Sequence, residues 1–272
     1  MPLITFTRGS LRASLKVARR LSGELGCTVI SREEVIDHAI AHGMDATGMA
    51  TTGFMESQPP HFWDGHAGQR RQYLIFLKAS LMDYMVKGNI IYLGHLGQFI
   101  LSDVPKLLRV RVDASLDFRV RALMQESELS EAEAEEHIKR IDSKRRSWAK
   151  FLYGADFDSP INYDMILNME HMSLDSLAEV IASAVKYPEW QLDEDTMKTI
   201  RDVHLASTVL ARLAASPRTR GMELEAKCDS KTGKTKVSGQ STLVGTETWE
   251  HDIKAVALEV DGVSSVDVED LR

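Results

Sequence analysis

Short apolar stretches alternate with helical stretches over the first two thirds of the chain, and this alternation limits the fold more than any other feature. The stretch at 89–93 is continuously apolar, as in strands that are buried on both faces of a sheet. Strands that alternate with helices indicate an α/β fold with a parallel, doubly wound sheet. The expected strands are the opening one from Leu3, then 28–30, 89–93, 107–112 and 165–168.

Three serines predict where helices begin. Ser31 is followed by Glu34 and Ser130 by Glu133, and both pairs have the spacing of a capping box, in which the two residues satisfy each other's free amides. Ser173 precedes a third helical stretch. We therefore expect helices that end near residues 42, 150 and 186.

The pattern changes after a stretch at 188–195 that reads as a linker. A helix is expected over 196–215, followed by strands at 222–228 and 235–241 around a turn at 230–233. A helix over about 246–260 and a strand at 263–268 complete the order αββαβ. We predict a larger domain over 1–187 and a small α+β domain over 196–272.

Composition excludes several classes of protein. The formal net charge is −7, which argues against a general nucleic-acid binder. Cys27 and Cys228 lie far apart, so a disulfide framework is not expected and a reducing cytoplasm fits. No stretch has the roughly 18 consecutive apolar residues of a membrane span. We expect a cytoplasmic protein without a membrane segment.

The first strand is followed by a short turn that reaches Ser14 and by a basic amphipathic helix over Leu15–Leu25, at the place where nucleotide-binding proteins hold phosphate. Glycines at such a turn let the backbone amides approach the phosphates closely. A lysine nearby contacts the phosphates with its side chain. Here the turn contains one glycine and lacks that lysine. The alternative is a turn without phosphate-binding function. The candidate contacts are Arg8, Gly9, Ser10, Arg12, Ser14 and Lys16.

Four further patterns occur in an order and spacing that resemble a known family. The segments are 4–8 with 17–21, 91–101, 110–115 with 119–121 and 142–145, and 159–168. Through them, residues 3 to about 186 resemble the cytidylate kinase-like family of P-loop nucleoside monophosphate kinases. The resemblance implies a kinase-like sheet flanked by helices, a helical lid, and phosphoryl transfer from ATP, with Mg²⁺, to a pyrimidine nucleoside monophosphate.

The resemblance also implies roles for single residues. Lid arginines would supply positive charge around the transferred group, and their planar guanidinium suits phosphate oxygens. Asp142 would accept a hydrogen bond from a ribose or position an arginine, and Arg119 is the leading candidate because it follows a strand end. The alternative for the arginines is a solvated, charged helix face. The candidates are Arg119, Arg140 and Arg145 for catalysis, and His95, Arg121 and Asp142 for substrate binding.

Residues from about 196 to 272 resemble a BON domain, most clearly in the segment Val260-Asp261-Gly262-Val263-Ser264-Ser265-Val266. The resemblance implies a module that binds a protein or a small ligand. A regulatory protein that binds nucleotides through the kinase-like fold but has lost turnover is therefore the alternative to an enzyme. A structural protein that forms a homodimer is the third hypothesis.

Histidines raise the question of a metal site. His38 and His42 are four residues apart on one predicted helix, while His61 and His66 follow in a loop. No carboxylate-rich motif accompanies them in the sequence, so we expect surface or loop residues and no metal.

Overall fold

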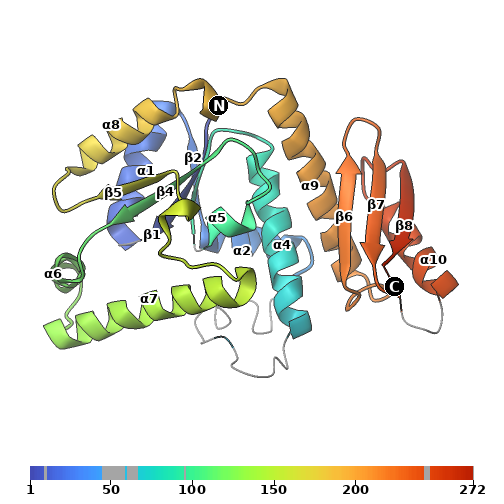
Figure 1. Ribbon diagram of the computed structural model, residues 1–272, viewed down its shortest axis with the longest axis horizontal. Helices are drawn as coiled ribbons and strands as arrows, with labels where there is room; N and C mark the ends of the chain where they lie inside the picture. Colours follow the sequence, from blue (N-terminus) through green and yellow to red (C-terminus); the bar gives the residue numbers. More distant parts are fainter. Residues whose placement is uncertain (9–10, 45–58, 60–66, 95, 242–245, 272) are drawn as a thin grey trace.

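The computed structural model describes residues 1–8, 11–44, 59, 67–94, 96–241 and 246–271. Figure 1 shows two sheets with helix α9 between them. The strands are β1 (Leu3–Arg8), β2 (Thr28–Ser31), β3 (Ile90–Leu93), β4 (Leu107–Asp113), β5 (Met165–Asn168), β6 (Leu224–Asp229), β7 (Lys234–Gly239) and β8 (Ser265–Asp270). The helices are α1 (Leu11–Leu25), α2 (Arg32–Ala41), α4 (Ala67–Met85), α5 (Gly97–Ile100), α6 (Leu116–Glu126), α7 (Glu131–Tyr153), α8 (Leu174–Ala184), α9 (Glu194–Ala215) and α10 (Thr246–Ala257).

The larger sheet has the strand order β2-β3-β1-β4-β5, and all its neighbouring strands are parallel. This confirms the predicted parallel α/β sheet. From β1 the chain leads toward β2, whereas from its neighbour β4 it leads toward β5. Two adjacent strands therefore send their connections to opposite sides, and such a point leaves a crevice at the carboxyl ends of the strands.

Alternate residues of the larger sheet face two different hydrophobic layers. Ile4 and Phe6 pack against α1 and α8 on one face, whereas Leu3 belongs to the cluster of α2, α4 and α7 on the other. Successive side chains of a strand point to opposite faces, so β1 contributes to both layers. Burial on both faces explains why the strands read as continuous apolar runs.

The predicted caps are confirmed, but the first helix begins earlier than expected. The hydroxyls of Ser31 and Ser130 accept from the amides of Glu34 and Glu133, and Ser173 caps α8. Helix α1 begins at Leu11 instead of Leu15. Leucine, arginine and alanine favour the helical conformation, and the segment contains only one glycine to disfavour it. The helix can therefore begin early in this segment.

The chain after 193 forms the expected order of helix, strand, strand, helix and strand, with the sheet order β6-β7-β8. Helix α9 lies against α4 on one side and β6 on the other. Its Ile200 belongs to the core of the larger sheet, whereas Val209 belongs to the core of the smaller one. One helix therefore contributes to both cores.

Candidate functional site

The carboxyl ends of β1 and β4 place polar side chains at the crevice of the larger sheet. Thr7 lies near the end of β1 and Asp113 at the end of β4, and the two strands are neighbours. Gln98, in the helix that follows β3, accepts a hydrogen bond from the Thr7 hydroxyl over 3.0 Å. Three adjacent strands thus contribute to one edge, where sheets of this kind bind ligands.

Arg111 is an arginine inside β4, and its guanidinium turns toward this edge. It forms ion pairs with Asp113, at 2.9 Å, and with Asp158, at 3.1 Å. It also lies over the rings of Phe157 and Tyr163, at 5.7 and 5.6 Å from their centroids. A charge in a buried strand is stable only with such partners. The contacts hold the guanidinium in one place.

Helices α6 and α7 bring two further arginines to the same edge. Nη1 of Arg119 is 2.7 Å from Oδ2 of Asp142, and Nη1 of Arg145 is 3.6 Å from Oδ1. The Arg145 side chain is only 8% exposed and that of Asp142 16%, so bulk water screens these charges little. Asp142 therefore positions two arginines at once.

These side chains enclose a hollow with a volume of about 40 Å³, which is room for a few water molecules and too little for a nucleotide. Its arginines outnumber its aspartates by one, so the wall carries net positive charge. A phosphate would bind there by replacing the aspartate carboxylates as the hydrogen-bond acceptor of the arginine N–H groups. The hollow is lined by Thr7, Arg111, Asp113, Arg119, Asp142, Arg145, Arg146, Phe157 and Asp158.

A chain of hydrogen bonds fixes the floor of the hollow. The Gln98 amide donates to the Tyr163 hydroxyl, which in turn donates to the backbone carbonyl of Phe157. Burial raises the pKa of Tyr163 to about 12, although Arg111 opposes the shift. The hydroxyl is therefore protonated at neutral pH and acts as a donor that positions its neighbours rather than as a base.

Asp158 carries negative charge at the rim. Burial acts to raise the pKa of its carboxyl, but the hydrogen bonds and charges of Arg146 and Arg111 outweigh burial and hold the pKa below the usual range. The carboxylate is therefore ionised at neutral pH and competes with any anion for both arginines.

The comparisons with known proteins bear on this edge of the sheet. Residues 3–171 match the cytidylate kinase-like family, which is more than half of the chain. The chain belongs to this family. The match covers β1 to β5 and α6 and α7, and with them every residue of the hollow. The expected kinase-like resemblance is thereby confirmed.

Individual relatives are distant. A cytidylate kinase from Staphylothermus marinus is 26% identical over 103 residues, which are 37% of this chain and 56% of that protein. A uronate isomerase from Corynebacterium glutamicum is 30% identical over 111 residues, 40% of this chain but 21% of that enzyme. The chain thus spans between about a fifth and just over half of the length of these relatives.

One of two similar solved structures supports the fold. An uncharacterized protein from Eubacterium ventriosum matches with a TM-score of 0.53 and 14% identity, over 68% of this chain and 98% of that one. A shikimate kinase from Bacteroides thetaiotaomicron matches with a TM-score of 0.40 and 11% identity, over 68% and 97%. The first likeness shows that the fold of this kinase-like region recurs at low sequence identity.

The structure brings together part of the predicted site of this cytidylate kinase-like protein. Arg119, Arg145 and Asp142 meet in the hollow, whereas Arg140 is exposed on α7 beside His137 and Arg121 is exposed on α6. Arg140 therefore lies apart from Arg119 and Arg145 in this structure, and its assignment to catalysis stays a prediction. Residue 140 lies five positions from 145, and on a helix of 3.6 residues per turn the two point in different directions.

The predicted phosphate contacts are also divided. Ser14 is fully buried in α1 and its hydroxyl has no hydrogen-bond partner, while Lys16 points to solvent. The backbone of Arg8 ends β1 and that of Arg12 lies in the first turn of α1. The remaining candidates, Gly9, Ser10 and His95, lie outside the described residues, as do His61 and His66.

Sequence reasoning missed Arg111, Arg146 and Asp158 as site residues. A signal was present for the first of them, because an arginine within an apolar strand of a covered sheet requires partners. Nothing in the sequence indicates that the segment around Asp158 turns back onto β4, since Asp158 lies 45 positions after the end of that strand.

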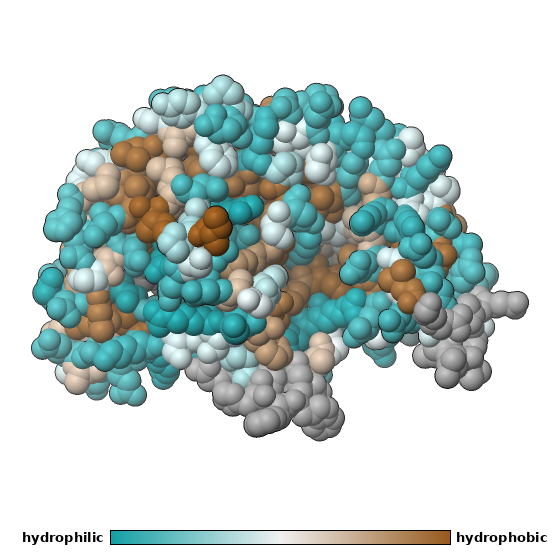
Figure 2. All heavy atoms as spheres, viewed as in Figure 1, coloured by the Kyte–Doolittle hydropathy of each residue, from teal (hydrophilic) through white to brown (hydrophobic). Residues whose placement is uncertain are grey.

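A second hollow, of about 680 Å³, lies between the kinase-like region and the C-terminal sheet. Figure 2 shows hydrophobic residues gathered between the two sheets on this face, with hydrophilic residues around them. Leu74 of α4, Phe99 of α5 and Leu210 of α9 contribute apolar surface.

No helix of the described residues is both long and apolar enough to cross a membrane.

Proposed function

We propose that the protein transfers the γ-phosphoryl group of ATP to a pyrimidine nucleoside monophosphate. The observation that carries the proposal is the meeting of Arg111, Arg119 and Arg145 at the carboxyl edge of β1 and β4, within the part of the chain that matches the family. Phosphoryl transfer asks the protein mainly for positioning and for positive charge around the transferred group.

Each arginine has a distinct task in this reaction. Arg111 is held by ion pairs and by the Phe157 ring, so it presents a fixed charge from the sheet. Arg119 and Arg145 come from helices and share Asp142, so a phosphate that enters can take over their N–H groups. Exchange of the Asp142 carboxylate for phosphate oxygens would couple substrate binding to movement of α6 and α7, as expected of a lid.

The substrate of such a reaction is the complex of ATP with Mg²⁺, an ion that takes oxygen ligands. The hydroxyl of Ser14, near the start of α1, is an oxygen without a protein partner, and the Asp113 carboxylate ends β4. A serine at the helix start and an aspartate at a strand end are the ligand types of P-loop enzymes. Both residue types therefore occur in this chain, in the helix after β1 and at the end of β4.

An assay of ADP release tests the proposal. The full chain is mixed with ATP, Mg²⁺ and one of CMP, dCMP or UMP, with AMP as a comparison. Release should depend on the pyrimidine monophosphate, and Arg119→Ala should slow it by about 10²–10³-fold. Lys139→Ala removes an exposed charge of α7 that pairs with Glu135, and should keep the rate. ADP release that no monophosphate raises above the level seen with ATP alone would refute the proposed phosphoryl transfer.

The second candidate is a regulatory protein that binds nucleotides without turnover and acts through a BON-like C-terminal domain. It is favoured by the link between β1 and α1, where only Gly9 and Ser10 separate strand and helix. The apolar hollow beside α9 would then receive a small ligand or a protein partner, including a second copy in a homodimer. A thermal shift with ATP or CMP that occurs without ADP release would select this candidate.

A further inference from the structure

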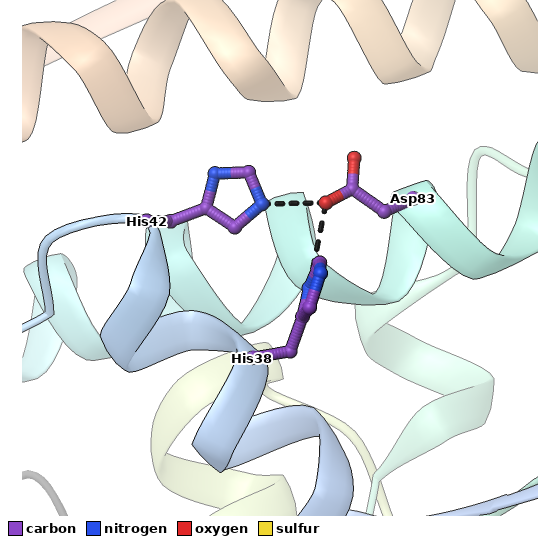
Figure 3. Close-up of side chains that lie close together, drawn as sticks. All are labelled: His38, His42 and Asp83. Atoms are coloured by element: carbon purple, nitrogen blue, oxygen red, sulfur yellow. Dashed lines mark hydrogen bonds and ion pairs between the residues drawn. The ribbon is translucent and has the colours of Figure 1, made fainter.

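Three imidazoles converge on one carboxylate where α2, α4 and α9 meet. Nε2 of His42 lies 2.5 Å from Oδ2 of Asp83, and Nδ1 of His38 lies 3.5 Å from the same oxygen. Nε2 of His204 lies 2.7 Å from the other oxygen, Oδ1. Figure 3 shows the two imidazoles of α2 directed at Asp83 of α4. The sequence offered no carboxylate for this histidine pair, and the fold supplies one.

One imidazole of this cluster makes no hydrogen bond through the nitrogen atom that faces the carboxylate. His42 and His204 each bind one carboxylate oxygen of Asp83. The buried Nδ1 atom of His38 has no hydrogen-bond partner, although it points at that carboxylate. A buried nitrogen with an unused lone pair costs free energy unless something fills the place in front of it.

The spacing of the atoms suits a cation in that place. The ligand atoms of His38, His42 and Asp83 all lie within 4.8 Å of one another. A tetrahedral Zn²⁺ with ligands at about 2.0–2.2 Å separates its ligand atoms by roughly 3.3 Å. Small rotations of the three side chains would therefore reach metal-binding geometry. Two histidines four residues apart on one helix is also the spacing of helical zinc sites.

The surroundings favour positive charge. His42 is the C-cap residue of α2, and the carboxyl end of a helix carries partial negative charge. The Asp83 carboxylate adds a full negative charge at the same point. The side chains are between 20% and 37% exposed, so a cation can enter from solvent and still be shielded once bound.

We propose that His38, His42 and Asp83 bind a divalent transition-metal ion of the zinc type. Two imidazoles and a carboxylate are a ligand set for such ions and leave a position for water or a further ligand. His204 donates to the second oxygen of Asp83 and orients the carboxylate, as outer partners do in metal sites. Because His204 belongs to α9, the ion would fasten the helix shared by both cores to α2 and α4.

Titration of the full chain with Zn²⁺ tests the site. The protein is stripped of metal with a chelator and titrated calorimetrically, and we expect one equivalent to bind. His38→Ala and Asp83→Asn should each weaken binding by more than about 100-fold, because loss of an outer partner alone costs about 10–100-fold. His204→Gln should fall within that smaller range. His251→Ala, an exposed histidine of α10, is the matched control and should bind as the wild type does.

Two titration results would overturn the proposal. One is a wild-type protein that binds less than one equivalent of Zn²⁺, which would leave an ion-pair cluster that only joins three helices. The other is unchanged Zn²⁺ affinity in both His38→Ala and Asp83→Asn, which would place the metal elsewhere. Circular dichroism confirms that the variants fold. The visible spectrum of the Co²⁺-loaded wild type gives a readout independent of mutation, since absence of ligand-field bands from nitrogen ligands also counts against the site.

Discussion

Arg119 and Asp142 join helices α6 and α7 through a contact of 2.7 Å between Nη1 and Oδ2, although 23 positions separate them in the chain. The same carboxylate holds Arg145 through its other oxygen. One aspartate thus determines where two of the candidate phosphate-binding arginines lie. The Nε atom of Arg119 is buried without a hydrogen-bond partner, so the pair is not fully satisfied and a further acceptor could still be accommodated.

Replacement of Asp142 by alanine should destabilise the protein. The two arginines would remain largely buried without their carboxylate, and we expect the free energy of unfolding to fall by about 1–3 kcal/mol. Urea denaturation followed by circular dichroism measures the change. Glu135→Ala removes an exposed carboxylate from the same helix, where its pair with Lys139 should contribute less than about 1 kcal/mol. Equal losses in the two variants would contradict the assigned role of Asp142.

The stability of the arginine cluster should depend on pH through Asp158. Its pKa is lower in the folded protein than in the unfolded chain, because the charges of Arg146 and Arg111 outweigh burial. Such a carboxyl stabilises the fold above its unfolded pKa of about 3.9, and this contribution is lost as the pH falls through the folded pKa. The free energy of unfolding of the wild type should therefore exceed that of Asp158→Asn by the largest amount at neutral pH. This difference should shrink below about pH 4.

Urea denaturation at a series of pH values measures that difference. Asp261→Asn changes an exposed aspartate in the turn before β8 and serves as the control. A difference for Asp158→Asn that stays constant from neutral pH to pH 3, or one that grows in acid, would contradict the ion pairs drawn for Asp158.

Two glycines should respond in opposite ways to alanine. A Cβ atom at Gly97, the first residue of α5, would overlap the Thr5 hydroxyl and would lie 2.8 Å from the Tyr92 ring. All three residues are buried, so we expect Gly97→Ala to lower stability by about 1–3 kcal/mol. Gly23 is exposed in α1 with no atom within 4 Å, and Gly23→Ala should raise stability by about 0.5–1 kcal/mol. Thermal denaturation of both variants measures these changes. A stabilised Gly97→Ala variant would contradict the close packing of Gly97 against Thr5 and Tyr92.

Helix α9 should couple the stability of the two sheets. Ile200 is fully buried in the core of the larger sheet, on the helix whose Val209 belongs to the core of the smaller one. Ile200→Ala should cost about 2–5 kcal/mol and lower amide protection in both sheets. Hydrogen exchange read by mass spectrometry compares β3 with β7. Ile161→Ala, at an 86% exposed isoleucine, should change neither. Loss of protection confined to β3 would mean that the two cores unfold independently.

Much of the fold was predictable because its signals are local. A capping box such as Ser31 with Glu34 lies within one helical turn, and its two hydrogen bonds form wherever that segment is helical. Apolar runs such as Ile90–Leu93 likewise predict strands that are covered on both faces. The start of α1 was the exception, since the expectation of a phosphate turn favoured a later first residue than Leu11.

The candidate site was predictable only in part. Arg119, Arg145 and Asp142 could be named from a family resemblance, and they lie together. Arg111 and Asp158 could not be paired from the sequence, because their contact depends on the path of the chain between β4 and β5. Charge patterns on a helix do not distinguish a solvated arginine such as Arg140 from one that faces a sheet.

By itself the sequence determined which segments become strands and helices, where the capped helices begin, and that a parallel sheet forms. These depend on hydrogen bonds and side-chain periodicity within a few residues. Tertiary structure alone decided that Asp83 meets His204 across 121 positions, and that Arg111 meets Asp158. Such contacts form between segments that only packing of the apolar layers brings together. A half-buried charge then takes whichever partner the packing places beside it.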